Sequence, residues 1–251
     1  MKIALVLGGI YREFEDCYSL VKDTIPPNTD IFFSTWTESR DYYKDSHNEI
    51  VVHDEKVSEK LIHSINKDIK CLLLDEKSTK ETVSEVKIGD TIVTYKEPKG
   101  LYHWKTAFNH FDLSKYDCII LSRPDQYVDY SEALKSYKED SLFYLQRLES
   151  GLVDRFLMGS YDNISKFIQE IDTKDSSGIH IRFENMLDRT EINYEQLDVD
   201  HVLIRLNYRI LRNSDKTLEK AKEKQGEYWT YRLGPDWIKS VKGKYPKKKV
   251  I

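Results

Sequence analysis

The first stretch of the chain constrains the fold more than any other. Residues 3–7 form an unbroken apolar run of the kind that is buried on both faces of a parallel sheet, and Gly8 and Gly9 end it. The apolar residues that follow recur at helical spacing, at Phe14, Cys17, Tyr18 and Val21. A second apolar run, residues 30–36, completes a strand, helix, strand unit whose crossover we expect to be right-handed.

Later apolar runs predict further elements. Residues 118–121 give the clearest strand after the first, and this strand ends abruptly at Arg123-Pro124-Asp125. A helix carries Tyr102, Trp104 and Lys105. The pattern also predicts strands at 51–52, 69–74 and 202–208, an edge strand at 152–158 and a hairpin over 86–93. It predicts helices from about residue 55 and over 162–171, 183–187 and 217–226. Residues 38–48 are expected to form a loop, and residues 137–146 a helix or a strand.

Composition narrows the class of protein. The chain has 251 residues, of which 39% are hydrophobic, and this is too many for a disordered protein. Its formal charge of -4 gives no global attraction to nucleic acid or membranes. No apolar stretch approaches the roughly 20 residues that a membrane span needs. Cys17, Cys71 and Cys118 form no CxxC pair, which is typical of reduced thiols in a cytosolic protein.

Ligands of open α/β sheets bind beyond the carboxyl ends of the strands, so the residues after the strongest strands are candidates for a site. At Gly8, Gly9, Tyr11 and Arg12, the glycines allow backbone N–H groups to approach a ligand, a helix N-terminus favours an anion, and the guanidinium suits phosphate. A tight turn with Arg12 in solvent is the alternative. The loop is neither a Rossmann GxGxxG nor a P-loop.

Two further points carry carboxylates. Asp125 can ligate Mg²⁺ or Mn²⁺, bind a ribose hydroxyl, or hold the adjacent Arg123 in place. Asp154, which precedes another apolar run, can act as a general base or a second metal anchor. Its alternatives are helix capping and a salt bridge with Arg155. Asp129 can join a site or remain a solvated loop acid.

Other chemistries find little support in the sequence. His180 and Glu184 have i,i+4 spacing, but the HExxH pattern is absent, which disfavours a zinc site. There is no GxSxG elbow and no cysteine in a nucleophile context, so hydrolytic triad chemistry is disfavoured. Six aromatic residues can form a stacking wall for a sugar or base, or pack in the core: Tyr102, Trp104, Tyr228, Trp229, Tyr231 and Trp237.

The candidate points occur in an order that resembles a family of GT-A-like glycosyltransferases common in viruses, phages and bacteria. The resemblance covers about residues 1–190. It is carried by the strand, Gly-x-x-Arg loop and helix of residues 1–18, Ser34-Thr35-Trp36, Tyr102-His103-Trp104-Lys105, Arg123-Pro124-Asp125, Asp154 with Phe156 and Gly159, and residues 180–184. It implies a GT-A-like (Rossmann-like) α/β fold with a mixed, mainly parallel sheet flanked by helices. We expect one domain over residues 1–238 and a basic tail over 239–251.

The resemblance also implies an activity, the transfer of a hexosyl or pentosyl group from a nucleoside diphosphate sugar to an acceptor such as a glycan. It assigns the donor to Gly8, Gly9, Tyr11, Arg12, Trp36, Lys105 and Arg123. Asp154 becomes the candidate base, and Asp125 a catalytic residue that binds Mn²⁺, Mg²⁺ or the sugar. No Asp-x-Asp is present, because Arg123 replaces the first acid. Either Arg123 neutralises the diphosphate or Asp125 alone holds a metal.

Two other functions stay open. The first is a phage-type transferase that glycosylates a hydroxymethylated base in DNA. Its direct support is the basic tail, with six lysines in thirteen residues, and a solvated tail is the alternative. A non-catalytic module that binds sugar nucleotides is the second. In each case we expect a cytoplasmic location, which is the host cytoplasm for a viral protein. Replacing Asp125 or Asp154 with alanine is expected to abolish transfer and leave the melting temperature nearly unchanged.

Overall fold

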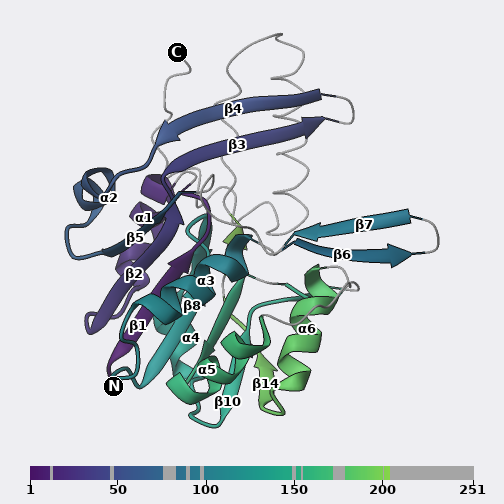
Figure 1. Ribbon diagram of the computed structural model, residues 1–251. Helices are drawn as coiled ribbons and strands as arrows, with labels where there is room; N and C mark the ends of the chain where they lie inside the picture. Colours follow the sequence, from purple (N-terminus) through teal and green to yellow (C-terminus); the bar gives the residue numbers. More distant parts are fainter. Residues whose placement is uncertain are drawn as a thin grey trace, which may run out of the picture.

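The structure is a computed structural model that describes residues 1–11, 14–45, 48–75, 83–88, 91–96, 99–148, 151–153, 155–171, 179–199 and 201–203 (Figure 1). Within residues 39–55 and 83–98 the description is of the backbone. The predicted helix over 217–226, the basic tail and the four aromatic residues from Tyr228 onward lie outside the described residues. No helix in the described part of the chain is long and apolar enough to span a membrane.

A seven-stranded sheet forms the centre of the fold. Its strand order is β14-β10-β13-β8-β1-β2-β5, and β13 alone runs antiparallel to its neighbours. The strands are β1 (Ile3–Gly8), β2 (Thr29–Trp36), β5 (Lys70–Leu74), β8 (Cys118–Ser122), β10 (Ser141–Tyr144), β13 (Phe156–Gly159) and β14 (Asn193–Gln196). The α/β class and the mixed, mainly parallel sheet flanked by helices are therefore confirmed.

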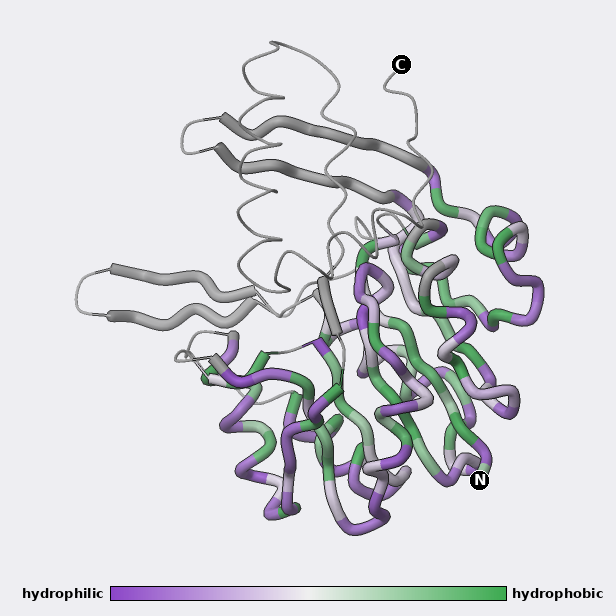
Figure 2. The backbone as a smooth tube through the Cα atoms, turned by 180° about the vertical axis from the view of Figure 1, so that it is seen from behind, coloured by the Kyte–Doolittle hydropathy of each residue, from purple (hydrophilic) through white to green (hydrophobic). Residues whose placement is uncertain are grey.

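Helices cover both faces of this sheet. The helices are α1 (Phe14–Val21), α2 (Glu59–Ile65), α3 (Lys99–His110), α4 (Tyr130–Lys135), α5 (Tyr161–Glu170) and α6 (Ile179–Arg189), with a 3-10 turn η1 (Lys22–Thr24) after α1. Residues of α1, α2 and α4 share one buried cluster with the side chains on one face of β1, whereas α3, α5 and α6 pack on the other face. Figure 2 shows the strands between these layers as mostly hydrophobic segments.

Two hairpins extend from the carboxyl-terminal edge of the sheet (Figure 1). They are β3 (Glu38–Asp45) with β4 (Asn48–Lys56), and β6 (Val83–Ile88) with β7 (Thr91–Lys96). The second confirms the predicted hairpin, whereas the loop expected over 38–48 was wrong. A ribbon held together by backbone pairing needs no apolar face, so a polar sequence there carries no alternating signal. Two shorter pairs join β11 (Arg147–Leu148) to β12 (Gly151–Leu152) and β9 (Gln126–Val128) to β15 (His201–Leu203).

Other differences from the sequence-based expectations concern boundaries and strand position. The segment expected as an edge strand contains β13, which lies between β8 and β10, because its residues are apolar on both faces and fill an interior position. The helix expected near residue 55 begins at Glu59, where the Ser58 hydroxyl accepts a hydrogen bond from the Leu61 N–H. Residues 141–144 are strand, and the helix expected over 183–187 spans the longer α6.

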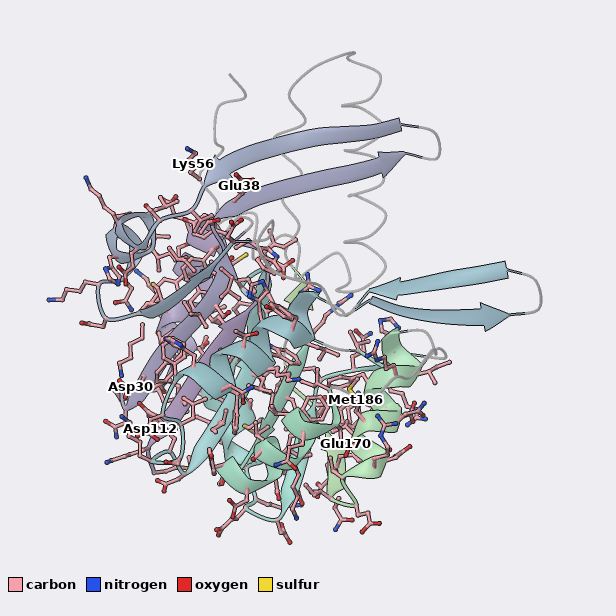
Figure 3. All side chains as sticks on the ribbon, in the orientation of Figure 1. Asp30, Glu38, Lys56, Asp112, Glu170 and Met186 are labelled. Carbon is pink, nitrogen blue, oxygen red and sulfur yellow. The ribbon has the colours of Figure 1, made fainter. Side chains whose placement is uncertain are left out.

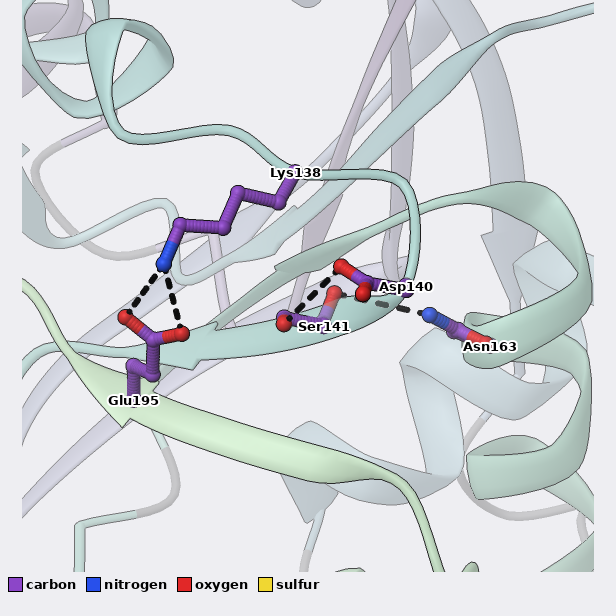
Figure 4. A network of polar contacts seen from close by, with 5 residues as sticks. All are labelled: Lys138, Asp140, Ser141, Asn163 and Glu195. Carbon is purple, nitrogen blue, oxygen red and sulfur yellow. Dashed lines mark hydrogen bonds and ion pairs between the residues drawn. The ribbon is translucent and has the colours of Figure 1, made fainter.

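One buried and one surface polar contact hold the part of the sheet formed by β10 and β14 (Figure 4). The amide of Asn163 on α5 donates to the Glu139 carbonyl at 2.9 Å, which ties the helix to the turn before β10. Lys138 pairs with Glu195 on β14 at 2.8 Å. Because the Lys138 and Glu195 side chains are about half exposed, this ion pair adds little stability, and the buried amide is the stronger anchor.

At the amino-terminal edge of the sheet, a hydrogen bond to a carboxylate should contribute a stability that depends on pH. Figure 3 labels Asp30 at this edge. The Tyr116 hydroxyl donates to the Asp30 carboxylate, which lowers the pKa of Asp30. Tyr116→Phe is therefore expected to lower the free energy of unfolding by about 0.5–1 kcal/mol near neutral pH, discounted because Asp30 is half exposed. A carboxylate with a depressed pKa stabilises the fold above about pH 3.9, so the deficit should shrink below that pH.

Urea unfolding at neutral and acid pH measures this effect. Tyr137→Phe is the matched control, because the Tyr137 hydroxyl donates to the Asp117 backbone carbonyl, which does not titrate in this range. Its deficit should be the same at both pH values. A Tyr116→Phe deficit that does not change with pH would contradict the assigned role of Asp30.

Candidate functional site

The carboxyl ends of β1 and β8 mark the point where the strand order reverses. From β1 the chain moves outward to β2 and then β5 on one side, and later returns through β8 on the other side. The connections that leave β1 and β8 therefore diverge. In open α/β sheets such divergence leaves a crevice at this edge, which is the usual ligand site. The Gly8-Gly9 loop and the Arg123-Pro124-Asp125 turn, both predicted as site segments, follow these two strands.

Close packing explains Gly8, and backbone conformation explains Gly9. A Cβ atom on Gly8 would lie 2.3 Å from Trp104 Cδ1, so the indole of α3 occupies the space that a side chain would need. Gly9 has φ of 140°, a conformation that L-residues with side chains rarely adopt. Its N–H donates to the Ser34 carbonyl at 3.2 Å, and a Cβ on it would lie 3.4 Å from Pro124. The two loops thus lie side by side, about one methyl group apart at this point.

Arg123 and Asp125 form a bidentate ion pair in the second loop. Arg123 Nε and Nη2 donate to the two carboxylate oxygens of Asp125, both at 2.8 Å. Asp125 is 1% exposed, whereas 22% of the Arg123 side chain surface remains accessible. The carboxylate therefore faces the guanidinium inside the protein, and part of the Arg123 side chain remains accessible at the surface. Of the three roles left open for Asp125, holding Arg123 is the one present in this structure.

The strand end beneath this loop is braced from both faces. Trp104 Nε1 donates to the Ser122 carbonyl at 3.0 Å, and the Tyr130 hydroxyl donates to Ser122 Oγ at 3.0 Å. Burial raises the pKa of the Tyr130 hydroxyl, which keeps it protonated as a donor. The residue before Arg123 therefore has little freedom, and the guanidinium is presented from a rigid strand terminus.

Aromatic side chains gather at the neighbouring end of β2. His103 Nδ1 hydrogen-bonds Ser34 Oγ at 2.9 Å, and the rings of Trp36 and Tyr102 stack with centroids 5.6 Å apart. The His103 ring meets Trp36 edge to face at 4.4 Å. Trp36 is 2% exposed and Tyr102 is partly exposed, so Tyr102 presents the outer ring of this stack. The Ser34–His103 link was not anticipated from the sequence.

Among the described residues, buried polar atoms without a hydrogen-bond partner at this edge include Thr35 Oγ1, Trp36 Nε1 and Gln126 Oε1. Such atoms are costly unless a ligand or water satisfies them. Trp36 was among the sequence-predicted donor-binding residues. Gln126 was missed, and only its position directly after Asp125 could have indicated it.

The other predicted site residues have different fates. The Tyr11 ring is 6% exposed and packs against Phe14 and Phe33, so it belongs to the core. Lys105 lies half-buried on α3, directly after Trp104. Arg12 and Asp154 lie outside the described residues.

Two further candidate residues have structural contacts. Asp129 caps α4, where its carboxylate accepts from the Glu132 N–H at 3.0 Å. Glu184 on α6 forms an ion pair with Arg147 at 2.5 Å. Within the described parts of the chain, no three His, Cys, Asp or Glu side chains converge as a metal site would require. The carboxylates named here therefore act through hydrogen bonds and ion pairs in this structure.

Comparison with known proteins gives structural but no sequence matches. No family model matches the chain, and no curated protein matches its sequence. Among solved structures, it is similar to the glycosyltransferase GlyE of Streptococcus pneumoniae at 7% identity and a TM-score of 0.44, covering 78% of this chain and 45% of that one. It is also similar to a protein of Desulfovibrio desulfuricans assigned as a nucleotide-diphospho-sugar transferase, at 12% identity and a TM-score of 0.42, covering 90% and 96%.

The two matched proteins are sugar transferases by name, and this chain spans less than half of the length of the first. At these TM-scores the geometry of the site has to carry the functional argument. What that geometry defines is an α/β protein with a rigid, arginine-bearing crevice at the switch point of its sheet.

Proposed function

We propose that this chain is a glycosyltransferase that transfers a sugar from a nucleoside diphosphate sugar to an acceptor. One observation carries the proposal: the Gly8-Gly9 loop lies beside the turn that presents Arg123, at the switch point of the sheet. Backbone N–H groups, a helix N-terminus and a guanidinium are the groups that proteins use to bind diphosphate. Their meeting at one crevice supports a phosphate-bearing ligand.

The proposed reaction asks this site to stabilise a leaving group. The bond between the anomeric carbon and the diphosphate oxygen breaks, its electron pair stays on the diphosphate, and the acceptor hydroxyl oxygen bonds to the same carbon. The Arg123 donors are fixed before the reaction, so they stabilise the developing charge without reorganising. Gly8 and Gly9 remain assigned to the diphosphate by their position beside the Arg123 turn, although Trp104 fills the space next to Gly8 and the Gly9 N–H donates to Ser34. Helix α1 directs its positive end to the same edge.

Remaining roles follow from position. Trp36 Nε1, Thr35 Oγ1 and Gln126 Oε1 are assigned to hydrogen bonds with the nucleoside or sugar, because each is buried at the crevice edge and needs a partner. Tyr102 offers a partly exposed ring for stacking. Lys105 and Arg12 are assigned to the diphosphate by charge. Asp154 remains our candidate for the base that accepts the acceptor proton.

A thermal-shift screen of nucleoside diphosphate sugars tests the proposal. A ligand at about 100 times its Kd adds about 2.7 kcal/mol of stability. For a chain of this size the melting temperature should then rise by roughly 5–10 °C. The free sugars and nucleosides without phosphate are the controls, and we expect them to give much smaller shifts. The proposal fails if no diphosphate sugar stabilises the protein.

Transfer is then measured with the stabilising donor and a panel of acceptors that includes glycans, phenols, alcohols and hydroxymethylated duplex DNA. Formation of a glycosylated product supports an enzyme and identifies the acceptor class. Donor binding without transfer or hydrolysis across the panel would instead identify a non-catalytic sugar-nucleotide module.

A further inference from the structure

The Asp125 carboxylate is unsuited to hold a metal ion in this structure. Magnesium and manganese take charged oxygen ligands at about 2.0–2.2 Å. Both oxygens of Asp125 already accept N–H groups of Arg123 at 2.8 Å, and the carboxylate is 1% exposed. A cation that reached it would have to displace the guanidinium, and it would then lie beside that positive charge. Both effects disfavour the cation.

Neighbouring residues do not supply a substitute set of ligands. Gln126, directly after Asp125, has a buried side-chain oxygen, Oε1, but this amide oxygen carries no charge. Ser122 Oγ already accepts from Tyr130, and the Ser122 carbonyl accepts from Trp104. No cluster of three acidic, histidine or cysteine side chains occurs in the part of the chain that the structure describes. The donor set at this strand end therefore fits a divalent cation poorly.

The same geometry suits direct contact with an anion. The paired carboxylate fixes the plane of the Arg123 guanidinium, since two parallel hydrogen bonds allow only one orientation. Arg123 Nε and Nη2 serve this pair, and 22% of the Arg123 side chain surface remains accessible. A planar donor held in one orientation can bind phosphate oxygens without a large loss of side-chain entropy.

We propose that this site binds its diphosphate without a divalent metal ion, with Arg123 contacting the phosphate oxygens and Asp125 acting as a positioning residue. This inference rests on the proposed function, which supplies the diphosphate. In group transfer the electron pair of the broken bond to the anomeric carbon moves to the diphosphate oxygen. The Arg123 guanidinium stabilises that charge and keeps its own protons. Asp125 neither gains a proton nor contacts the substrate.

Calorimetric titration with nucleoside diphosphates tests the inference. The uridine, guanosine, cytidine, adenosine and thymidine diphosphates are each titrated into the whole chain, once with excess EDTA and once with excess Mn²⁺. We expect the diphosphate that binds to have the same Kd in both buffers, with a difference well below about tenfold. A Kd at least about tenfold weaker in EDTA would overturn the inference and leave the proposed function standing. If no diphosphate binds in either buffer, both fail.

Variants separate the two roles. Arg123→Lys keeps the charge but loses the planar fork, and we expect it to weaken diphosphate binding in EDTA by about tenfold or more. Asp125→Asn keeps the shape and one acceptor oxygen for the guanidinium. We expect it to raise KM more than it lowers kcat and to leave binding insensitive to Mn²⁺. Each variant is first checked for the wild-type circular dichroism spectrum, so that loss of binding reports on the site.

Electron paramagnetic resonance of Mn²⁺ gives an independent readout. Adding the protein alone should leave the signal of aqueous Mn²⁺ unchanged. When the nucleoside diphosphate is also present, the signal should equal that of Mn²⁺ with the nucleotide and no protein. Binding of Mn²⁺ that Asp125→Asn abolishes would show that the carboxylate is a metal ligand and would overturn the inference.

Discussion

Replacing Arg123 with alanine is expected to lower kcat/KM for the proposed transfer by about 10²–10³, which corresponds to about 2.7–4 kcal/mol of barrier. The same change should lower the free energy of unfolding by about 3–5 kcal/mol, since it leaves the buried Asp125 carboxylate without its partner. Both effects have one cause, the loss of the guanidinium between the carboxylate and the crevice. Steady-state kinetics and urea unfolding of the same preparation measure them.

Arg189→Ala is the matched control for the Arg123 experiment. Arg189 also pairs with a carboxylate, Glu170, at 2.6 Å, but Arg189 is exposed and Glu170 is partly exposed, unlike the buried Asp125. Its loss should cost less than about 1 kcal/mol and leave kcat/KM unchanged. The assignment of Arg123 would be contradicted if its alanine variant behaved like the control.

The fate of Asp125 changes an expectation that the sequence alone supports. A carboxylate in a ligand site can be removed at little cost in stability, which is why Asp125→Ala was expected to leave the melting temperature nearly unchanged. The bidentate pair makes that expectation untenable. We now expect Asp125→Ala to lower the melting temperature, although by less than Arg123→Ala, because the remaining guanidinium can reach water.

Much of the fold and the position of the site are local properties that a sequence displays. The apolar run of β1, its two glycines and the apolar run of β8 are contiguous, and each strand ends where its polar turn begins. The carboxyl ends of parallel strands share an edge, so the two site loops could be expected to meet. The N-cap of α5 is also local, because the Ser160 hydroxyl accepts from the Asn163 N–H three residues later.

The remaining features depend on contacts between distant residues. The reversed direction of β13 is set by its pairing with β8 and β10, and its apolar sequence is equally compatible with either direction. The choice among three roles for Asp125 depended on burial, which the sequence does not display. The hydrogen bond between Ser34 and His103 joins residues 69 positions apart. None of these has a local pattern from which it could be predicted.

The contact between Gly8 and Trp104 yields the second large prediction, a double-mutant cycle. Trp104 is fully buried, and Trp104→Ala is expected to cost about 3–5 kcal/mol of unfolding free energy. Gly8→Ala should cost about 1–3 kcal/mol in the wild-type background, because its methyl group would lie 2.3 Å from Trp104 Cδ1. Once the indole has been removed, much of that second cost should vanish.

The combined variant is therefore expected to be more stable than the sum of the single effects predicts, with a coupling energy of about 0.5–3 kcal/mol. Rescue should be incomplete, because the added methyl group would also lie 3.1 Å from the Trp104 backbone nitrogen. Gly100→Ala on the same helix is the control. A Cβ there meets no atom within 4 Å, so alanine should be neutral or stabilise the helix by up to about 1 kcal/mol. Additive costs at Gly8 and Trp104 would mean that the indole does not determine the glycine. Coupled costs would show that packing of the Trp104 indole from α3 against Gly8 determines the shape of the loop after β1.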